Sequence, residues 1–225
     1  MYLSIPEFPF FFQLFLAALL LLQLLLAVKS IDWASLYLLR VRQHLVFGSL
    51  FILFILWQLR GWFDDQIAIY VLGVNLLTLI LGWAYATVIV VINHVLLVLI
   101  GTNQQEFFLV NTFFFAALPV VVSFLCYRLV VYFFDNPFAY IFLCGFWAAV
   151  ATLVVPAAVL WVVMSLVGMP KAELLWMYLT YSPVICIPEG VLNGMILVSL
   201  VIFHPDLVKT YDEFRYEENS RNKYQ

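Results

Sequence analysis

Long apolar runs recur along the whole 225-residue chain, and most polar positions lie in the short segments between them. The runs do not alternate apolar and polar residues with a period of two, as the strands of a membrane barrel do. A bilayer core about 30 Å thick needs roughly 20 apolar helical residues for one crossing. Backbone groups in lipid must also be paired internally, which helices achieve. The pattern therefore predicts an all-α integral membrane protein folded as a helical bundle.

Seven membrane spans fit the runs: 10–28, 44–59, 67–82, 84–100, 107–127, 138–167 and one within 174–203. The third and fourth divide the segment 66–101, which holds no Asp, Glu, Lys or Arg over 36 positions and is too long for one crossing. Gly82 offers the break between them. Pro156 predicts a kink in the sixth span, and Pro183 and Pro188 predict an interruption of the last.

The basic residues favour one orientation of these spans. With the N-terminus outside, eight of the ten Lys and Arg residues fall on the inner side, and only Arg60 and Lys171 fall outside. Such a bias is typical of cytoplasmic loops. A six-span alternative, with 66–101 counted once, moves Arg128 and the basic C-terminal tail to opposite sides. We therefore expect about seven spans, with the N-terminus out and the C-terminus in.

Little of the chain remains for a soluble domain. Hydrophobic residues make up 66% of it and charged residues 10%, against about 25% charged in soluble domains. We expect a transmembrane domain at 1–204 and a cytoplasmic tail at 205–225. The N-terminal run carries Glu7 and lacks a basic leader, so we expect a retained helix rather than a cleaved signal.

The longest loop, 29–43, could form an interfacial helix. It contains Asp32 and Trp33, and its end carries Arg40 and Arg42 beside His44. These basic residues either face lipid phosphates or bind a cytoplasmic partner.

Polar residues inside spans are costly and therefore informative. Glu189 is the only carboxylate deep in an apolar run, and Asn193 follows it by four residues on the same helical face. The neighbouring Pro188 and Gly190 predict a weakened helix, or hinge, at this point. Two roles stay open for Glu189: a charge or proton relay on a substrate path, or a hydrogen-bonded group that holds neighbouring helices together.

Other polar residues of the spans have simpler expectations. His94 is expected as a hydrogen-bonded packing group, with metal ligation as the alternative. Interhelical hydrogen bonds are the default for Asn75 and Asn111. The three cysteines sit singly in apolar runs, where cysteine packs as a small apolar residue. We expect no metal site and no cofactor.

Several function classes lack their motifs. The sequence has no Walker A loop, no HExxH pair and no plausible Ser/His/Asp set. Nothing in it supports nucleic-acid binding. We therefore expect a protein that is not an enzyme and whose surroundings are the lipid bilayer and other membrane subunits.

Three stretches carry a family resemblance: QHLVFG at 43–48, IAIYVLGVNLLTLILGW at 67–83, and PEGVLNGM at 188–195 followed by FHPD at 203–206. They resemble the energy-coupling-factor transporter permeases, in the branch of the CbiM-like cobalt and nickel capture subunits. The resemblance implies a CbiM-like bundle in the bacterial inner membrane that works with separate ATPase subunits.

In that family, the metal is held by a histidine directly after the starting methionine and by the histidine of a His-x-x-Gly. Here those positions hold Tyr2 and Tyr70. A phenol, whose pKa is about 10, is a poor ligand for nickel or cobalt. We therefore expect a substrate-binding, permease-like component of an energy-coupling-factor transporter whose metal site is lost. The alternative is a non-transporting accessory subunit that stabilises or assembles a larger membrane complex.

Overall fold

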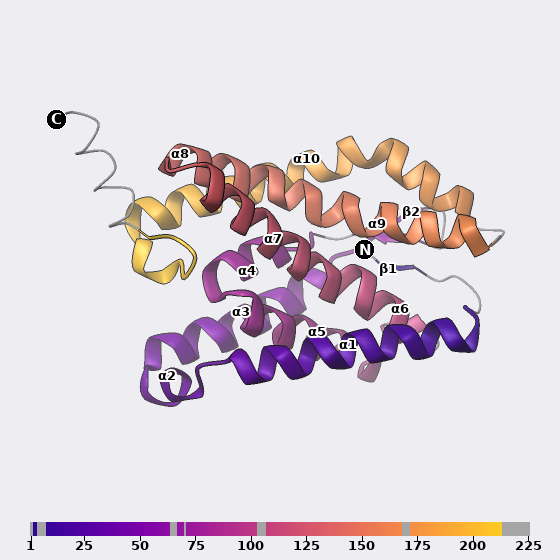
Figure 1. Ribbon diagram of the computed structural model, residues 1–225, viewed down its shortest axis with the longest axis horizontal. Coiled ribbons are helices and arrows are strands. Elements are labelled where there is room, and N and C mark those ends of the chain that lie inside the picture. The colour runs from indigo at the N-terminus through magenta and orange to yellow at the C-terminus, as the bar shows by residue number, and fades with distance from the viewer. Residues whose placement is uncertain are drawn as a thin grey trace.

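The helices run along the long axis of the molecule in the computed structural model (Figure 1), which describes residues 2–3, 8–63, 67–69, 71–102, 107–167 and 172–212. The first helix, α1 (Phe10–Ser30), packs only a narrow stripe of its surface against the rest of the bundle. Its remaining apolar side chains are exposed, as they must be on a helix that faces lipid. The expected helical membrane bundle is confirmed.

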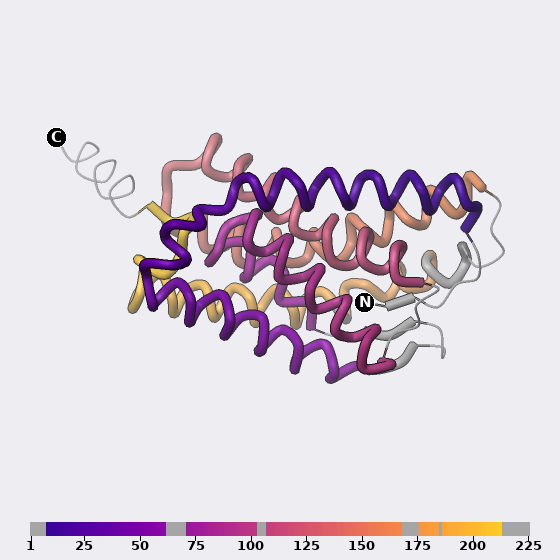
Figure 2. The backbone as a smooth tube through the Cα atoms, turned by 90° about the horizontal axis from the view of Figure 1, so that it is seen from below, coloured from indigo at the N-terminus to yellow at the C-terminus, as the bar shows by residue number. Residues whose placement is uncertain are grey.

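The loop after α1 does contain a short helix, α2 (Trp33–Leu38). The Asp32 side chain caps it by accepting a hydrogen bond from the backbone N–H of Ser35 at 3.1 Å. The next helix, α3 (Arg40–Gln58), begins four residues before the predicted span at 44. Figure 2 shows α1 and α3 on opposite sides of the bundle, joined at the end where α2 lies.

A small antiparallel sheet follows α3 and was not predicted. It consists of β2 (Gly61–Phe63), β3 (Ile67–Ile69) and the N-terminal β1 (Tyr2–Leu3), in the order β1-β3-β2. Tyr2 pairs with Ala68, so the start of the chain lies beside the segment that precedes α4.

The segment 67–82 is therefore not one continuous helix. After β3 the chain extends to Gly73 and then forms α4 (Val74–Leu81), which has only eight residues. The predicted break at Gly82 is confirmed, with φ at 85° and ψ at 161°. The chain continues as α5 (Trp83–Leu99).

Two long helices contain wider π-helical stretches. One is built from α6 (Phe108–Thr112), η2 (Phe113–Ala117) and α7 (Leu118–Phe133). The other is built from α8 (Pro137–Ala139), η3 (Tyr140–Trp147) and α9 (Ala148–Val167), with Pro156 inside α9. A π-helical turn displaces carbonyls from the regular i to i−4 pattern and often marks functional sites.

The last helix, α10 (Ala172–Phe203), runs through Pro183 and Pro188 without the interruption predicted there. A short 3₁₀ helix, η4 (Pro205–Leu207), follows it. Val208 is buried in a cluster with Leu79 and Tyr140, so the first residues of the predicted tail pack on the bundle. The boundary between bundle and tail stays a prediction.

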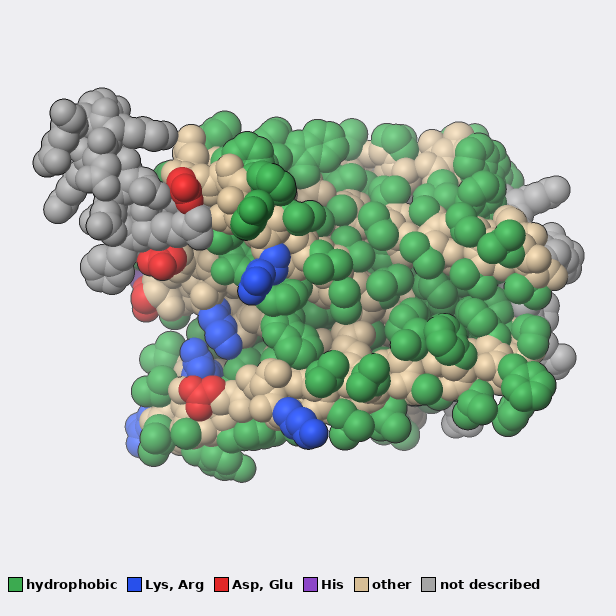
Figure 3. All heavy atoms as spheres, in the orientation of Figure 1, with side chains coloured by type: hydrophobic (Ala, Val, Ile, Leu, Met, Phe, Trp, Pro, Cys, Tyr) green, Lys and Arg blue, Asp and Glu red, His purple; other side chains and the backbone are tan. Residues whose placement is uncertain are grey.

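Within the described residues, five helical stretches are long and apolar enough to cross a membrane, and α5 is a shorter apolar helix. Figure 3 shows the charged side chains of this face gathered toward one end, with a hydrophobic surface over the rest. The Tyr85 hydroxyl donates to the Asp32 carbonyl, and the Lys209 ammonium lies 5.7 Å from the Tyr85 ring centroid. Thr210 in turn bonds to Tyr140, so these four segments meet near one another. The number of spans and their orientation stay predictions.

Candidate functional site

The short helix α4 lies in the middle of the bundle, and six of its eight residues are buried. At a rise of 1.5 Å per residue it is about 12 Å long, less than half the thickness of the bilayer core. Because the helix is this short and ends at the Gly82 turn, its first end lies inside the bundle. The first N–H groups and last C=O groups of a helix lack partners within it, so these ends need partners from elsewhere.

Glu189 of α10 supplies partners for the first end. Its Oε2 atom accepts from the Leu72 backbone N–H at 3.0 Å, and its Oε1 atom accepts from the Gly73 backbone N–H at 2.9 Å. The side chain is only 4% exposed. All partners donate, which matches a carboxylate, because a carboxylate only accepts. Its negative charge also lies at the positive end of the α4 dipole.

Asn193, one turn further along α10, completes this arrangement. Its Nδ2 group donates to Glu189 Oε1 at 2.9 Å, and its Oδ1 atom accepts from the Leu76 backbone N–H at 3.1 Å. The expectation that Glu189 and Asn193 share one helical face is thereby met in the structure. Together they bind three backbone N–H groups at the start of α4.

The turn that leads into α4 depends on Gly73 and Trp57. Gly73 has φ at 63°, a left-handed conformation that glycine adopts without steric cost. The Trp57 indole N–H donates to the Leu72 carbonyl at 3.0 Å. Leu72 is therefore bonded on both sides, by α3 through its C=O and by α10 through its N–H.

The tail supplies partners for the other end of α4. The Lys209 backbone N–H donates to the Ile80 carbonyl at 3.0 Å. Thr210 donates to the Leu79 carbonyl twice, from its backbone N–H at 3.2 Å and its hydroxyl at 2.8 Å. The Thr210 hydroxyl also bonds to the Tyr140 hydroxyl at 2.7 Å. Both ends of α4 are thus held by α10 and the segment directly after it.

Asn75 connects α4 sideways to two further helices. Its Nδ2 group donates to the carbonyls of Cys144 at 2.9 Å and Gly145 at 3.3 Å, both in the π-helical η3. Its Oδ1 atom accepts from the Ser123 hydroxyl of α7 at 2.7 Å. These are the interhelical bonds expected of Asn75, and η3 provides the carbonyls for them.

His94 adjoins this site through Trp57. The two rings meet edge to face, with their centroids 5.0 Å apart. The histidine is buried and neither ring nitrogen has a hydrogen-bond partner among the described residues, so the bond expected for it is not seen there. Asn111 donates to the Phe107 carbonyl one turn earlier at 2.9 Å, and its interhelical role stays a prediction. Over the described ranges, no three His, Cys, Asp or Glu side chains cluster closely enough to hold a metal ion.

Gly190 has a packing role that differs from the expected hinge. A Cβ atom at this position would lie 2.9 Å from the Phe146 ring and 3.1 Å from Val150. Glycine therefore lets α10 approach the helix that contains η3 and α9. Whether Pro188 and Gly190 also act as a hinge stays a prediction.

The arrangement brings together Glu189, Asn193 and Asn75 around α4, with His94 beside them. It also uses Trp57, Ser123 and Thr210, which sequence reasoning missed. The spacing of Gly73 and Gly82 was an available signal for a short helix with unusual turns at both ends. Nothing in the sequence indicated that the tail would bind the second end.

Comparisons with known proteins identify the family of this chain. No curated protein and no solved structure matches the chain. A family model described as the cobalt uptake substrate-specific transmembrane region, CbiM, matches residues 8–207. This match covers most of the 225 residues. The chain therefore belongs to the CbiM family of membrane components for cobalt uptake.

Proposed function

We propose that this chain is the substrate-capture membrane component of an energy-coupling-factor transporter, working with separate ATPase subunits, and that it does not use the family's cobalt or nickel site. The observation that carries the transport part is the family match over residues 8–207. Membership makes the protein a membrane component of a cobalt-uptake type of system. The substrate and the partner subunits are our inference.

The loss of the metal site is argued from residue types. Tyr2 lies in β1 and pairs with Ala68 of β3, which is two residues before position 70 in the sequence. The resemblance would require imidazoles at positions 2 and 70. Both positions hold tyrosine, and Tyr70 itself lies outside the described residues. Phenols do not suit nickel or cobalt, for which imidazole nitrogen is the usual ligand.

A second candidate is a non-transporting accessory subunit in a larger membrane complex. The hydrogen bonds of Glu189 favour it, because the carboxylate binds backbone groups at the start of α4 and thereby holds the bundle together. In this case the family fold is kept because it stabilises the larger complex, and the loss of the metal ligands does not affect the function.

Affinity purification of the full chain in mild detergent distinguishes the two. Recovery of ATPase and coupling subunits, with uptake that depends on them, supports the transporter. Recovery of a large complex without ATPases supports the accessory role. Calorimetry with NiCl₂ and CoCl₂ tests the metal site separately, with Tyr2→His and Tyr70→His together as the matched variant. Tight binding by the unmodified protein, abolished by Tyr70→Phe, would contradict the loss of the site.

A further inference from the structure

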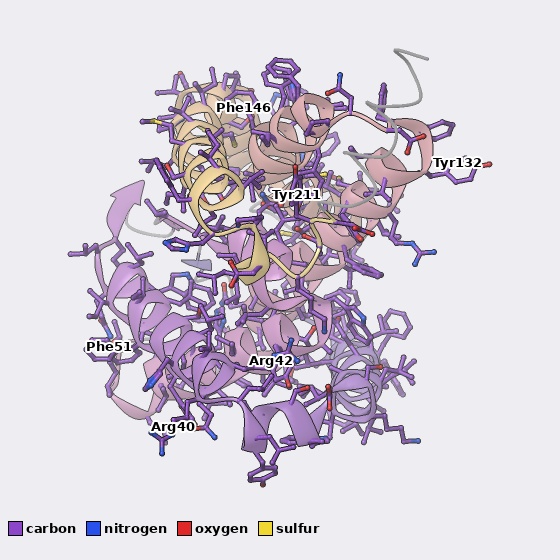
Figure 4. All side chains as sticks on the ribbon, turned by 90° about the vertical axis from the view of Figure 1, so that its left-hand side faces the viewer. Arg40, Arg42, Phe51, Tyr132, Phe146 and Tyr211 are labelled. Carbon is purple, nitrogen blue, oxygen red and sulfur yellow. The ribbon has the colours of Figure 1, made fainter. Side chains whose placement is uncertain are left out.

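A cavity of about 290 Å³ opens at the end of the bundle where α3 begins. Among its lining side chains are three cations, Arg40, Arg42 and Lys209, and one carboxylate, Asp206. Figure 4 views this end and shows Arg40 and Arg42 on the first turn of α3, with Arg42 nearer the middle of the bundle. The lining of the cavity therefore carries a net positive charge.

Two of the cations lie near one aromatic ring. The Arg42 guanidinium lies 6.0 Å and the Lys209 ammonium 5.7 Å from the centroid of Tyr85. Partial burial lowers the pKa of Lys209, and the Arg42 guanidinium lowers it further, while Asp32 acts in the opposite direction. Asp32 also pairs with Arg42 at 3.9 Å. An anion bound beside both cations would relieve the repulsion that Asp32 offsets only in part.

The cavity continues into an apolar groove of about 570 Å³ between α3 and α10, above α4. Leu45 and Ile80 line both. Along α3 the groove extends from His44 to Leu56, which is about 18 Å of helix. One leaflet of the bilayer core is about 15 Å deep. The groove thus has the depth of one leaflet, and it begins at the basic cavity.

We propose that the cavity and groove together bind one anionic glycerophospholipid, with its phosphate among Arg40, Arg42 and Lys209 and an acyl chain between α3 and α10. Exposed Leu38 and Leu39 beside the cations place the site at the lipid boundary, where basic residues attract anionic headgroups. A soluble phosphate would use the cavity and leave the groove unexplained. An acidic protein segment would likewise need no groove that follows the depth of a leaflet.

The test is native mass spectrometry of the full-length protein in detergent, titrated with phosphatidylglycerol, phosphatidylcholine or sn-glycerol 3-phosphate. We expect phosphatidylglycerol to bind about tenfold or more tighter than phosphatidylcholine. Combined Arg40→Gln, Arg42→Gln and Lys209→Gln should remove this preference. Arg40→Gln with Lys209→Gln should weaken it while the Arg42–Asp32 ion pair remains. Arg128→Gln, which changes a cation outside the cavity, should leave it unchanged.

A variant in the groove tests the contact with the acyl chain separately from the contact with the headgroup. Gly48 lines the groove, and a Cβ atom there would meet nothing within 4 Å, so Gly48→Leu can extend a side chain into the groove. It should weaken binding of both lipids. Equal binding of the two lipids would overturn the proposal. So would a loss of preference in Arg128→Gln as large as that in the combined Arg40, Arg42 and Lys209 variant. Two further results would overturn it. In the first, Gly48→Leu leaves phosphatidylglycerol binding unchanged and sn-glycerol 3-phosphate displaces that lipid fully. In the second, the groove holds a copurified subunit that Gly48→Leu releases and that no lipid displaces.

Discussion

Glu189 and Gly73 are 116 residues apart in the chain, yet the Glu189 carboxylate accepts the Gly73 backbone N–H at 2.9 Å. Through this bond a residue of α10 caps the short helix α4. The cap is needed because α4 starts inside the bundle, where no water can satisfy its first N–H groups.

The first prediction concerns the two oxygens of this carboxylate. Oε2 accepts from Leu72, and Oε1 accepts from Gly73 and Asn193. In Glu189→Gln one oxygen becomes an NH₂ group that faces a donor, so one N–H loses its acceptor. We expect a loss of stability of about 1–3 kcal/mol. Glu189→Leu removes both acceptors and should cost more.

Denaturant unfolding of the purified protein in detergent measures this loss. Asp206→Asn serves as the matched control, because Asp206 is exposed. Stability of Glu189→Gln equal to that of the unmodified protein would contradict the cap. Loss of uptake at unchanged stability would support the relay role.

The helical membrane bundle and the break at Gly82 could be predicted, because both follow from apolar length and glycine. The cap on α4 could not, because it depends on which helix lies beside Gly73. For an assembly role of Glu189, which needs only hydrogen bonds, Gln would be expected as a replacement. The separate use of its two oxygens argues against that.

The sheet and the π-helical turns were missed for a related reason. The segment at 67–69 is as apolar as a helix, and its strand conformation depends on pairing with Tyr2 and with Gly61–Phe63. In η3, the carbonyls of Cys144 and Gly145 find their partner in Asn75, from another helix. Local sequence carries no signal of such distant partners.

The second prediction tests the bond between Asn75 and Ser123. A double-mutant cycle with Asn75→Ala and Ser123→Ala should give a coupling energy of about 0.5–1.5 kcal/mol, the range expected for interhelical bonds in membranes. Ser199 is the control, because its hydroxyl bonds to the Met195 carbonyl of its own helix. The cycle of Asn75→Ala with Ser199→Ala should be additive. Equal coupling in both cycles would contradict a specific contact.

The third prediction compares two glycines one turn apart on α10. At Gly190 a Cβ atom would lie 2.9 Å from the Phe146 ring, whereas at Gly194 its nearest neighbour would be 3.8 Å away. Phe146 is stacked on Phe142 with ring centroids 5.9 Å apart, so it cannot shift without disturbing that pair. Gly194→Ala should be neutral or stabilising through helix propensity, and Gly190→Ala should lose about 1–3 kcal/mol.

Thermal unfolding of both variants in one detergent measures the difference. Phe146→Leu should make Gly190→Ala tolerable by removing the ring that the new methyl group meets. Equal stability of the two alanine variants would show that α10 can move away from η3 at no cost.

The last prediction separates seven spans from six. The seven-span path places Ser35 and Asp135 on the inner side and Gly61 on the outer side. If 66–101 crossed only once, Asp135 would instead lie outside.

Single cysteines at Ser35, Gly61 and Asp135 can be labelled in intact cells with a reagent that does not cross the membrane. All three positions are at least partly exposed, so labelling reports their side of the membrane. The unmodified protein, with its own Cys126, Cys144 and Cys186, sets the background. We expect labelling of Gly61→Cys alone, and of the other two only after the cells are opened. Labelling of Asp135→Cys in intact cells would contradict the division of 66–101 at Gly82, because α7 would then end on the outer side.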